Sequence, residues 1–298
     1  MRVFVTGATG FIGSRVVSEL IAAGHQVLGL ARSDDGARRL GDAGAEVHRG
    51  ALEDPGSLAS GAARSDAVIH TAFDHDFSNF VANCEKDRRV IEAMGAALAG
   101  SNRPLIITSG TGMGSAAPGR PATEDVVDWN NLNPRIASEQ AGADQAARGV
   151  SVAVVRLPQV HDTVKQGLIT PAVEIARAKG VSAYVGDGAN RWPAAHVADV
   201  ARLYRLALER HEAGARYHAV AEEGVPVRRI AEVVGAGLGV PVASLSPAEA
   251  MEHFGWLAPF AGFDLPASGA WTHERLGWKP TGPGLIADLE RMNYSSAA

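Results

Sequence analysis

Residues 6–13 read Thr6-Gly7-Ala8-Thr9-Gly10-Phe11-Ile12-Gly13, and this stretch decides the fold. The apolar run Arg2-Val3-Phe4-Val5 before it predicts a buried strand, and residues 15–23 after it predict a helix that Gly24 ends. A glycine-rich turn between a strand and a helix lets the backbone approach a pyrophosphate, which amide N–H groups and the positive helix end stabilise. The stretch therefore predicts a dinucleotide site that contains Thr6, Gly7, Thr9, Gly10, Phe11, Ile12 and Gly13.

Strand and helix patterns alternate along the first half of the chain. Strands are expected at 26–31, 45–48, 67–71, 104–108 and 151–156, and helices at 34–40, 55–63, 78–99 and 134–148. This alternation predicts an α/β fold with a doubly wound parallel sheet. From about Leu157 the segments shorten and the expected strands at 183–185 and 216–220 look isolated. We therefore expect a dinucleotide-binding core at 1–156 and a smaller substrate-binding portion at 157–298, with residues 197–220 packing back on the core.

Composition is that of a water-soluble globular enzyme. Of the 298 residues, 46% are hydrophobic and 20% are charged, and the net charge of −5 gives no indication of nucleic-acid binding. Cys84 is the single cysteine, so the chain holds no internal disulfide and no cysteine-rich metal site, and no zinc-binding pattern occurs. No apolar run approaches about 20 residues and no signal pattern precedes the first strand, so we expect no membrane segment and a cytoplasmic location.

Several motifs resemble one enzyme superfamily. Gly7, Gly10 and Gly13 lie three residues apart, which is similar to the turn of the short-chain dehydrogenase/reductase superfamily, in its extended and atypical branches of epimerase/dehydratase-like proteins. The resemblance continues through the stretches 67–72, 104–109, 155–158, 196–201 and 275–280, and so covers almost the whole chain. It implies a Rossmann fold and a nicotinamide cofactor. It does not imply one activity, because members of such superfamilies perform many reactions.

The end of the second expected strand bears on the choice of cofactor. It reads Leu28-Gly29-Leu30-Ala31-Arg32-Ser33, with alanine where a ribose-binding acid is usual. Arg32 can hold a 2′-phosphate with two hydrogen bonds and Ser33 can add another, which favours NADP(H), with NAD(H) as the alternative. Two other interpretations stay open: Arg32 is a solvated loop charge, and Asp34 and Asp35 are helix caps.

The resemblance extends to the rest of the cofactor site. Ala51 and Leu52 correspond to the pair that flanks adenine, although the family often has aspartate at the first position. Thr71, Ala72 and Phe73 are expected on the pyrophosphate and ribose side. The ends of the fifth and sixth strands are expected to contact the cofactor through Thr108, Leu157 and Pro158.

The catalytic residues usual in the superfamily are missing. Its members carry a Ser or Thr after the fifth strand and Tyr-x-x-x-Lys on the next helix, whereas none of the four tyrosines here lies on that helix. The resemblance places Arg135 at the tyrosine, Glu139 at the lysine and Gly110 at the serine, with Thr111 beside it. Arginine does not donate its proton at neutral pH, but it can stabilise an oxyanion. Glu139 follows by four residues, so an Arg135–Glu139 pair is expected, either in the site or as a surface ion pair.

Three further side chains are candidates for catalysis. His75 lies between Asp74 and Asp76, which favour the imidazolium form of a general acid, although the same loop can equally cap a helix before Ser78. His161 follows the sixth strand, and its alternative is a surface histidine. Thr111 can donate to a substrate carbonyl, and its alternative is a hydroxyl bonded to the backbone.

The C-terminal portion offers two features. Arg191 lies where nucleotide-sugar enzymes of the extended branch bind a diphosphate, and His196 and Asp199 are expected to anchor a helix start. Aromatic residues crowd 251–271, which is typical of a lid over an apolar pocket, of a packing layer or of a dimer surface: Phe254, Trp256, Phe260, Phe263 and Trp271. A homodimer therefore stays a hypothesis.

Three functions compete. The first is an NADP(H)-dependent oxidoreductase that reduces a small, largely apolar carbonyl, imine or activated alkene. The second is an epimerase or dehydratase of a sugar nucleotide, which the loss of Tyr-x-x-x-Lys disfavours. The third is a non-enzymatic NADP(H)-binding redox sensor.

Overall fold

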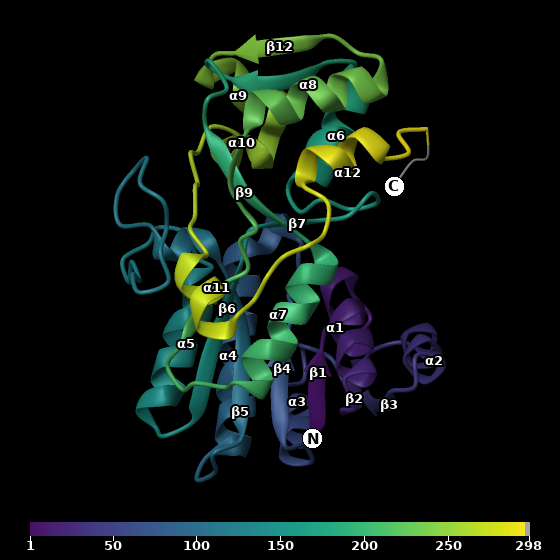
Figure 1. Ribbon diagram of the computed structural model, residues 1–298, viewed down its shortest axis with the longest axis vertical. Helices are drawn as coiled ribbons and strands as arrows, with labels where there is room; N and C mark the ends of the chain where they lie inside the picture. The colour runs from purple at the N-terminus through teal and green to yellow at the C-terminus, as the bar shows by residue number, and fades with distance from the viewer. Residues whose placement is uncertain (296–298) are drawn as a thin grey trace.

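The alternating segments form a parallel sheet in the computed structural model, which describes residues 1–295 (Figure 1). Its strand order is β10-β6-β5-β4-β1-β2-β3, and every neighbouring pair is parallel. The order reverses between β1 and β4, as in a doubly wound sheet. The prediction of the fold is thus confirmed. The strands are β1 (Arg2–Thr6), β2 (Gln26–Ala31), β3 (Glu46–Arg49), β4 (Ala67–His70), β5 (Pro104–Gly110), β6 (Ser151–Leu157) and β10 (Arg216–His218).

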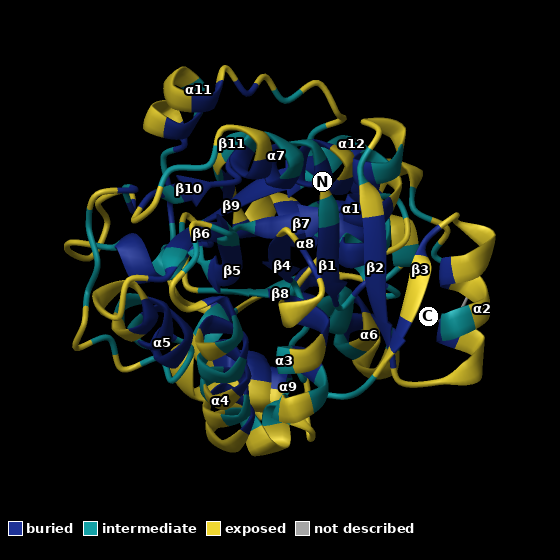
Figure 2. Cartoon of the chain, turned by 90° about the horizontal axis from the view of Figure 1, so that it is seen from below, coloured by how far each residue is buried: buried dark blue, intermediate teal, exposed yellow. Residues whose placement is uncertain are grey.

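Helices cover both faces of this sheet. One face buries an apolar core under α1 (Phe11–Ala22), α2 (Asp34–Asp42) and α7 (Val197–Glu209). The other does so under α3 (Pro55–Ala63), α4 (Phe80–Leu98) and α5 (Ile136–Ala147). Figure 2 shows the central strands buried between these layers, with β3 exposed at one edge. Such burial on two faces explains why the strands read as nearly continuous apolar runs.

The expected elements differ from the structure in three places. Helix α1 begins at Phe11 rather than near residue 15, because the glycine-rich turn leads directly into it. The helix expected from 78 begins with a 3-10 turn, η1 (Phe77–Asn79), before α4. The strand at 216–220 is not isolated: as β10 it pairs with β6 and extends the central sheet.

A smaller group of elements lies at the carboxyl ends of the strands. The sheet is parallel and β1 starts at the end marked N, so all seven carboxyl ends point toward this group (Figure 1). Two small sheets have the orders β11-β9-β7 and β12-β8. The strands are β7 (Gln159–His161), β8 (Ser182–Val185), β9 (Arg191–His196), β11 (Glu222–Pro226) and β12 (Val242–Leu245). The helical elements after β5 outside α5 and α7 are η2 (Thr111–Gly114), α6 (Ile169–Lys179), α8 (Val227–Leu238), α9 (Pro247–Phe254), η3 (Gly255–Leu257), α10 (Ala258–Ala261), α11 (Ala270–Leu276) and α12 (Leu285–Arg291).

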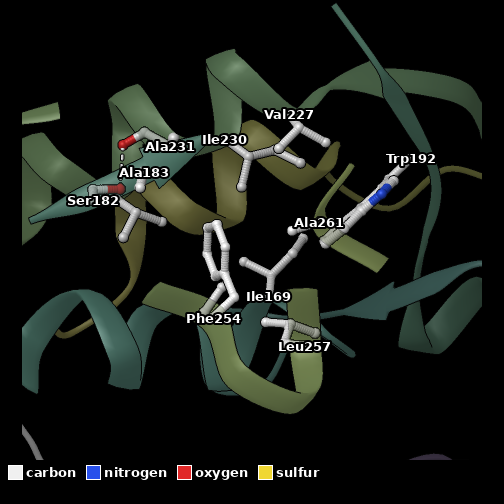
Figure 3. Close-up of a pocket in the computed structure, with 12 residues that line it drawn as sticks. Ile169, Ser182, Ala183, Trp192, Val227, Ile230, Ala231, Phe254, Leu257 and Ala261 are labelled. Atoms are coloured by element: carbon white, nitrogen blue, oxygen red, sulfur yellow. Dashed lines mark hydrogen bonds between the residues drawn. The ribbon is translucent and has the colours of Figure 1, made fainter. Parts of the chain in front are cut away.

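An apolar cavity lies inside this smaller group, between α6, α8, β8 and α9 (Figure 3). Its volume is about 30 Å³, which is close to the share of one water molecule in the liquid. Ile169, Ile230 and Phe254 are among its lining residues. The cavity is too small for an organic substrate. Phe254 here belongs to a packing layer, one of the three alternatives for the aromatic stretch.

Two features are absent from residues 1–295. Within residues 1–295, no helix combines the length and apolar character needed to cross a bilayer. In the same range, no three His, Cys, Asp or Glu side chains are grouped so that they could hold a metal ion.

Candidate cofactor and substrate site

The glycine-rich turn has the geometry of an anion cradle. Gly7 has φ +65°, a left-handed conformation that favours glycine, and a side chain at Gly13 would overlap the Gly7 carbonyl. Gly10 differs from both, because its backbone is extended and an added Cβ would meet only the Gly7 oxygen, at 3.1 Å. Gly10 is also the N-cap of α1, whose first turn has neither a capping side chain nor an acid. The backbone amides in the first turn of α1 can therefore hold a pyrophosphate.

Strand β4 holds this turn in place. The Thr71 hydroxyl donates to the Thr6 carbonyl at 2.7 Å, and the Ala72 amide donates to the Thr6 hydroxyl at 3.3 Å. Thr6 is fully buried and its Oγ1 lies 2.6 Å from Nδ1 of His70. The structure thus brings together three residues expected in the cofactor site, Thr6, Thr71 and Ala72, with Thr6 and Thr71 supporting the turn through their side chains.

The end of β2 offers a free cation. Arg32 is exposed and forms no hydrogen bond or ion pair with any other residue of the described chain. Ser33 is the N-cap of α2, and its oxygen accepts from the Gly36 amide at 3.1 Å. The interpretation of Asp34 and Asp35 as caps is therefore wrong: they lie in the first turn and pair with Arg49 and Arg38. The Ser33 hydroxyl proton stays available as a donor.

The other residues expected around the cofactor follow the carboxyl ends of several strands of the sheet. Leu52 packs on the core under α3 and α4, and the Ala51 amide donates to the Ser57 hydroxyl at 3.3 Å. The Thr9 carbonyl accepts from Arg39 at 3.2 Å. Leu157 ends β6, and Pro158 follows it.

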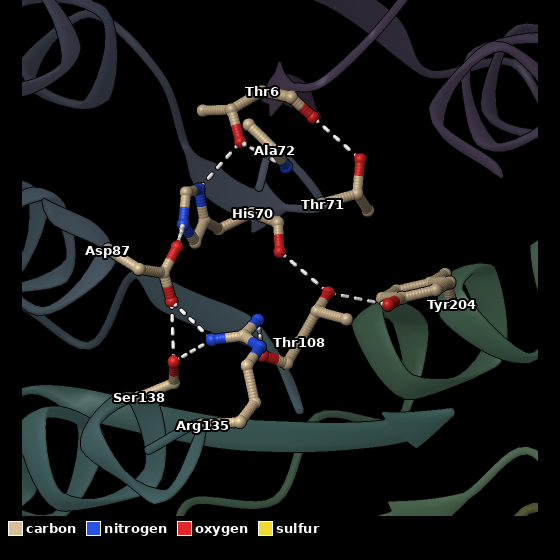
Figure 4. Close-up of polar contacts among 9 residues, drawn as sticks. All are labelled: Thr6, His70, Thr71, Ala72, Asp87, Thr108, Arg135, Ser138 and Tyr204. Carbon is tan, nitrogen blue, oxygen red and sulfur yellow. Dashed lines mark hydrogen bonds and ion pairs between the residues drawn. The ribbon is translucent and has the colours of Figure 1, made fainter. Parts of the chain in front are cut away.

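Arg135 is held at the carboxyl end of β5 (Figure 4). Its Nη1 donates to Asp87 at 2.7 Å and to Ser138, and its Nη2 donates to the Thr108 carbonyl at 2.9 Å. Phe73 lies beneath the guanidinium, with its ring centre 4.1 Å from Cζ. Of the N–H groups, the one on Nε and one on Nη2 have no partner among residues 1–295. The guanidinium is thus fixed in place and still has donors to offer.

A buried chain of hydrogen bonds connects this arginine to the glycine-rich turn (Figure 4). Asp87 accepts from Nε2 of His70 at 2.9 Å and from Ser138 at 2.5 Å. The Thr6 hydroxyl already accepts from Ala72, so it can donate to Nδ1 of His70. With an Nε2 proton toward Asp87 and Nδ1 accepting from Thr6, the His70 ring fits both of its contacts.

The charge on Asp87 depends on these hydrogen bonds. Burial opposes its ionisation, but Arg135, His70 and Ser138 outweigh this effect and hold its pKa below the usual carboxyl range. A folded-state pKa below the unfolded value means that Asp87 stabilises the fold above roughly pH 4, and that this contribution is lost as the pH falls.

We therefore expect Asp87→Asn to lower the free energy of unfolding by roughly 1.5–3 kcal/mol at neutral pH, because a hydrogen-bonded charge is removed. The deficit should shrink as the pH falls below roughly 4, because the unfolded wild type takes up a proton there whereas folded Asp87, with its lowered pKa, does so only at lower pH. Urea unfolding of both proteins across this pH range measures it. An equal deficit at every pH would show that Asp87 carries no charge in the fold.

The predicted Arg135–Glu139 pair is wrong. Glu139 is buried and pairs with Arg156 of β6 through two hydrogen bonds of 2.7 and 2.8 Å. Arg135 precedes the first residue of α5 and points toward Asp87 instead, and its side chain is only 14% exposed, so it is no surface ion-pair partner either. Residues four apart pair only when both lie on the helix, and Arg135 lies before the first residue of α5.

His75 does not have the charge expected of it. Asp74 pairs with Lys86 at 2.8 Å, and Asp76 accepts from Ser78 as the cap of η1, which was the alternative interpretation of this loop. Desolvation, followed by Arg135 and Lys165, lowers the pKa of His75 despite Asp74. The expectation of an imidazolium is therefore wrong.

The remaining candidates lie in different surroundings. Thr111 opens η2 directly after β5 and is buried. His161 is fully buried, and its Nδ1 lies 2.7 Å from Asp288 of α12, so the interpretation as a surface histidine is wrong. Desolvation lowers its pKa. Arg191 is bound by Asp264 at 2.8 Å.

The helix-start residues behave as expected. His196 caps α7 through the Ala198 amide, and Asp199 accepts from the amides of Thr281 and Gly282. Sequence reasoning missed Asp87, Ser138 and Tyr204, whose hydroxyl bonds to Thr108 at 2.6 Å. Asp87 could have been found, because a charged residue on the buried face of a helix such as α4 indicates a buried partner.

Comparison with known proteins agrees with this geometry. The model of the NAD dependent epimerase/dehydratase family matches residues 3–221. The chain belongs to this family. The resemblance to the extended short-chain dehydrogenase/reductases and the nicotinamide-dinucleotide dependence of the family are thus confirmed.

Two relatives and one solved structure are similar to this chain. An uncharacterized protein of Schizosaccharomyces pombe is 48% identical over 99% of this chain and 100% of its own length. The 2-alkyl-3-oxoalkanoate reductase of Stenotrophomonas maltophilia is 30% identical, over 81% of this chain and 77% of its own. The dTDP-glucose 4,6-dehydratase of Streptomyces venezuelae, solved with NAD bound, has a TM-score of 0.77 at 21% identity, over 98% of this chain and 96% of its own. That likeness confirms the Rossmann-like fold.

Proposed function

We propose that the protein is an NADP(H)-dependent oxidoreductase that reduces a small, largely apolar carbonyl, imine or activated alkene. One observation carries the proposal: Arg135 is anchored by Asp87 and the Thr108 carbonyl and keeps unpaired N–H groups. The resemblance aligns Arg135 with the family's tyrosine, and its guanidinium lies against β5. A fixed cation there can stabilise the negative charge that develops on a substrate oxygen.

The chain fits the cofactor that this function requires. Gly7, Gly10 and Gly13 leave the room at the start of α1 that a pyrophosphate needs, and the first turn carries no acid to repel it. When bound, NADPH supplies a hydride to the substrate carbon. Arg32 then supports the 2′-phosphate, which distinguishes NADPH from NADH.

The other steps fall to the protein and the solvent. Reduction of a carbonyl adds a hydride to carbon and a proton to oxygen. Arg135 holds the oxygen while the charge develops, but it cannot give up a proton. Desolvation lowers the pKa of His75, which disfavours the imidazolium form that a proton source needs. The proton comes from solvent or through Thr111.

Two observations favour reduction over epimerisation or dehydration. The resemblance aligns Glu139 with the family's lysine, but Glu139 forms a buried ion pair with Arg156. A base that opens an oxidation cycle is therefore missing at this position. The Stenotrophomonas maltophilia relative, named as a reductase, supports the same choice.

An NADPH consumption assay over a panel of carbonyls, imines and activated alkenes, with product analysis, tests this function. Consumption of NADPH matched mole for mole by reduced product is expected. Sugar-nucleotide turnover with no net cofactor change would instead reveal an epimerase or dehydratase. NADPH binding without turnover of any substrate would favour a redox sensor.

We expect NADPH to bind more tightly than NADH, because Ala31 removes the ribose-binding acid and the free Arg32 can clamp the 2′-phosphate. Arg32→Ala should weaken NADPH binding by roughly 1.5–3 kcal/mol and leave NADH binding unchanged. Calorimetric titration of both cofactors measures this, with Arg38→Ala on the following helix α2 as the control, since Arg38 is paired with Asp35. Equal wild-type affinities for NADPH and NADH would contradict the assignment.

A further inference from the structure

His70 of β4 is connected to Arg135 by two routes (Figure 4). Through its side chain, Nε2 lies 2.9 Å from Oδ1 of Asp87, and Oδ2 of the same carboxylate accepts from Arg135 Nη1 at 2.7 Å. Through its backbone, the His70 carbonyl accepts from the Thr108 hydroxyl at 2.7 Å, and the Thr108 carbonyl accepts from Arg135 Nη2 at 2.9 Å. Both terminal nitrogens of the guanidinium are therefore held by residues that are themselves bonded to His70.

The orientation of the Asp87 carboxylate depends on its partners. The torsion that turns a carboxylate about its last carbon–carbon bond has only a broad preference, so hydrogen bonds fix the plane of the group. Its Oδ2 atom has two partners, Arg135 and Ser138. Its Oδ1 atom has one within residues 1–295, which is the imidazole of His70. Without the imidazole the carboxylate can turn, and the oxygen that Arg135 contacts then shifts.

The His70 ring is fixed in turn from the side of the glycine-rich turn. Its own torsion is equally broad, and its Nδ1 atom lies 2.6 Å from the hydroxyl of Thr6. His70 and Thr6 are fully buried and Asp87 is 1% exposed, so bulk solvent does not compete for these contacts. The imidazole is thus held at both nitrogens, and it holds Oδ1 of Asp87 in one place.

We propose that His70 is a positioning residue for the reduction: it keeps Asp87 in the orientation that fixes Arg135, and, being buried, does not touch substrate itself. This rests on the proposed function and deepens it. A catalytic donor has to stay within about 0.5 Å and 10–20° of its productive position, and this accuracy comes from the residues packed behind it. In this site Asp87 supports the arginine and His70 supports Asp87.

Two amide variants separate the two contacts of the ring. His70→Gln places an N–H donor near the position of Nε2 and keeps the contact with Asp87, whereas His70→Asn places its amide near Nδ1 and keeps only the contact with Thr6. We expect His70→Asn to lower kcat about tenfold, within the loss of up to about 10² that a misplacement of roughly 1 Å causes. The Thr108 carbonyl still holds the guanidinium, so the loss stays below that of Arg135→Ala. His70→Gln should recover most of the rate, and both variants should keep the KM for NADPH.

His211→Asn is the matched control. His211 bonds through Nε2 to Ser151 at 2.8 Å, at the amino end of β6 and hence at the opposite edge of the sheet. Its kcat should equal that of the wild type. A wild-type kcat in His70→Asn, or an equal fall in His70→Asn and His70→Gln, would overturn the inference, because the contact with Asp87 would then have no part in the rate.

Nuclear magnetic resonance tests the inference without any turnover. Two-bond nitrogen–hydrogen correlation spectra show which ring nitrogens of a histidine carry a proton, and we expect a proton on Nε2 of His70 in the wild type. A bare Nε2 cannot donate to Asp87 and would overturn the inference even if carbonyl reduction is confirmed. The Nε–H signal of Arg135, identified by its absence from Arg135→Lys, should shift in His70→Asn and stay in place in His70→Gln.

The same spectra separate this inference from the proposed function. If no compound of the panel is reduced, the proposed function fails, while the shift of the Arg135 signal still shows that His70 positions the guanidinium. An Arg135 signal that is unchanged in His70→Asn would overturn the positioning role, whatever the protein reduces.

Discussion

Arg135→Ala lowers kcat for NADPH-dependent carbonyl reduction by about 10²–10³, the usual loss when one donor to a developing oxyanion is removed. The affinity for NADPH stays near that of the wild type, because Arg135 touches the end of β5 and not the glycine-rich turn. Arg135→Lys keeps the charge but not the fork that holds Asp87 and Thr108 together, so it recovers only part of the rate. Steady-state kinetics at saturating NADPH measure all three proteins.

The structural role of Arg135 calls for two controls. Its removal leaves Asp87 buried without its cation, so part of any loss could come from a disturbed fold. In Asp87→Asn/Arg135→Ala both charges are gone, and the rate should stay low if the guanidinium acts on substrate. Arg103→Ala removes another half-buried arginine, one that binds backbone carbonyls far from the site, and should keep kcat. Wild-type kcat in Arg135→Ala, or its recovery in the double variant, would contradict the catalytic role.

Gly10→Val abolishes NADPH binding and leaves the protein folded. The extended backbone of Gly10 accepts any residue, and the added Cβ meets one carbonyl oxygen at 3.1 Å, a close contact that a small shift of the turn relieves, so we expect folding to be retained. The branched side chain then occupies the space in which the pyrophosphate approaches the start of α1. Calorimetric titration with NADPH and thermal unfolding measure the two halves of this prediction.

Gly41→Val is the matched control. Gly41 lies in α2, with nothing within 4 Å of an added Cβ, and its substitution should change neither cofactor binding nor folding. Gly7 and Gly13 are less suitable positions, because a side chain at either disturbs the turn itself. Undiminished NADPH affinity in folded Gly10→Val would show that the turn is not the phosphate site.

Features that depend on local sequence were predictable. The glycine-rich turn and the alternation of strands with helices follow from spacings within a few residues, and they led to the observed sheet. The strand at 216–218 was expected, but its place in the central sheet was not, because the strand with which it pairs, β6, is distant in sequence.

The ion-pair partners in the site were harder to predict from the sequence. Arg135 has Asp87, 48 residues away, as its partner, and Glu139 has Arg156 on a different strand. Only the packing of α4, α5 and β6 brings these charges together. His161 shows the same limit: its neighbours Asp288 and His196 come from distant elements, and burial rather than neighbouring sequence lowers its pKa.

The most direct test of the proposed chemistry follows the transferred hydrogen. NADPH deuterated at both hydrogens of the nicotinamide C4 is supplied to the wild-type protein with an aldehyde of the panel, and mass spectrometry locates the label in the product. The account predicts an alcohol with one deuterium on the former carbonyl carbon, formed far more slowly by Arg135→Ala. Reduced product without that deuterium, or no reduced product with any carbonyl, imine or activated alkene of the panel, would contradict it.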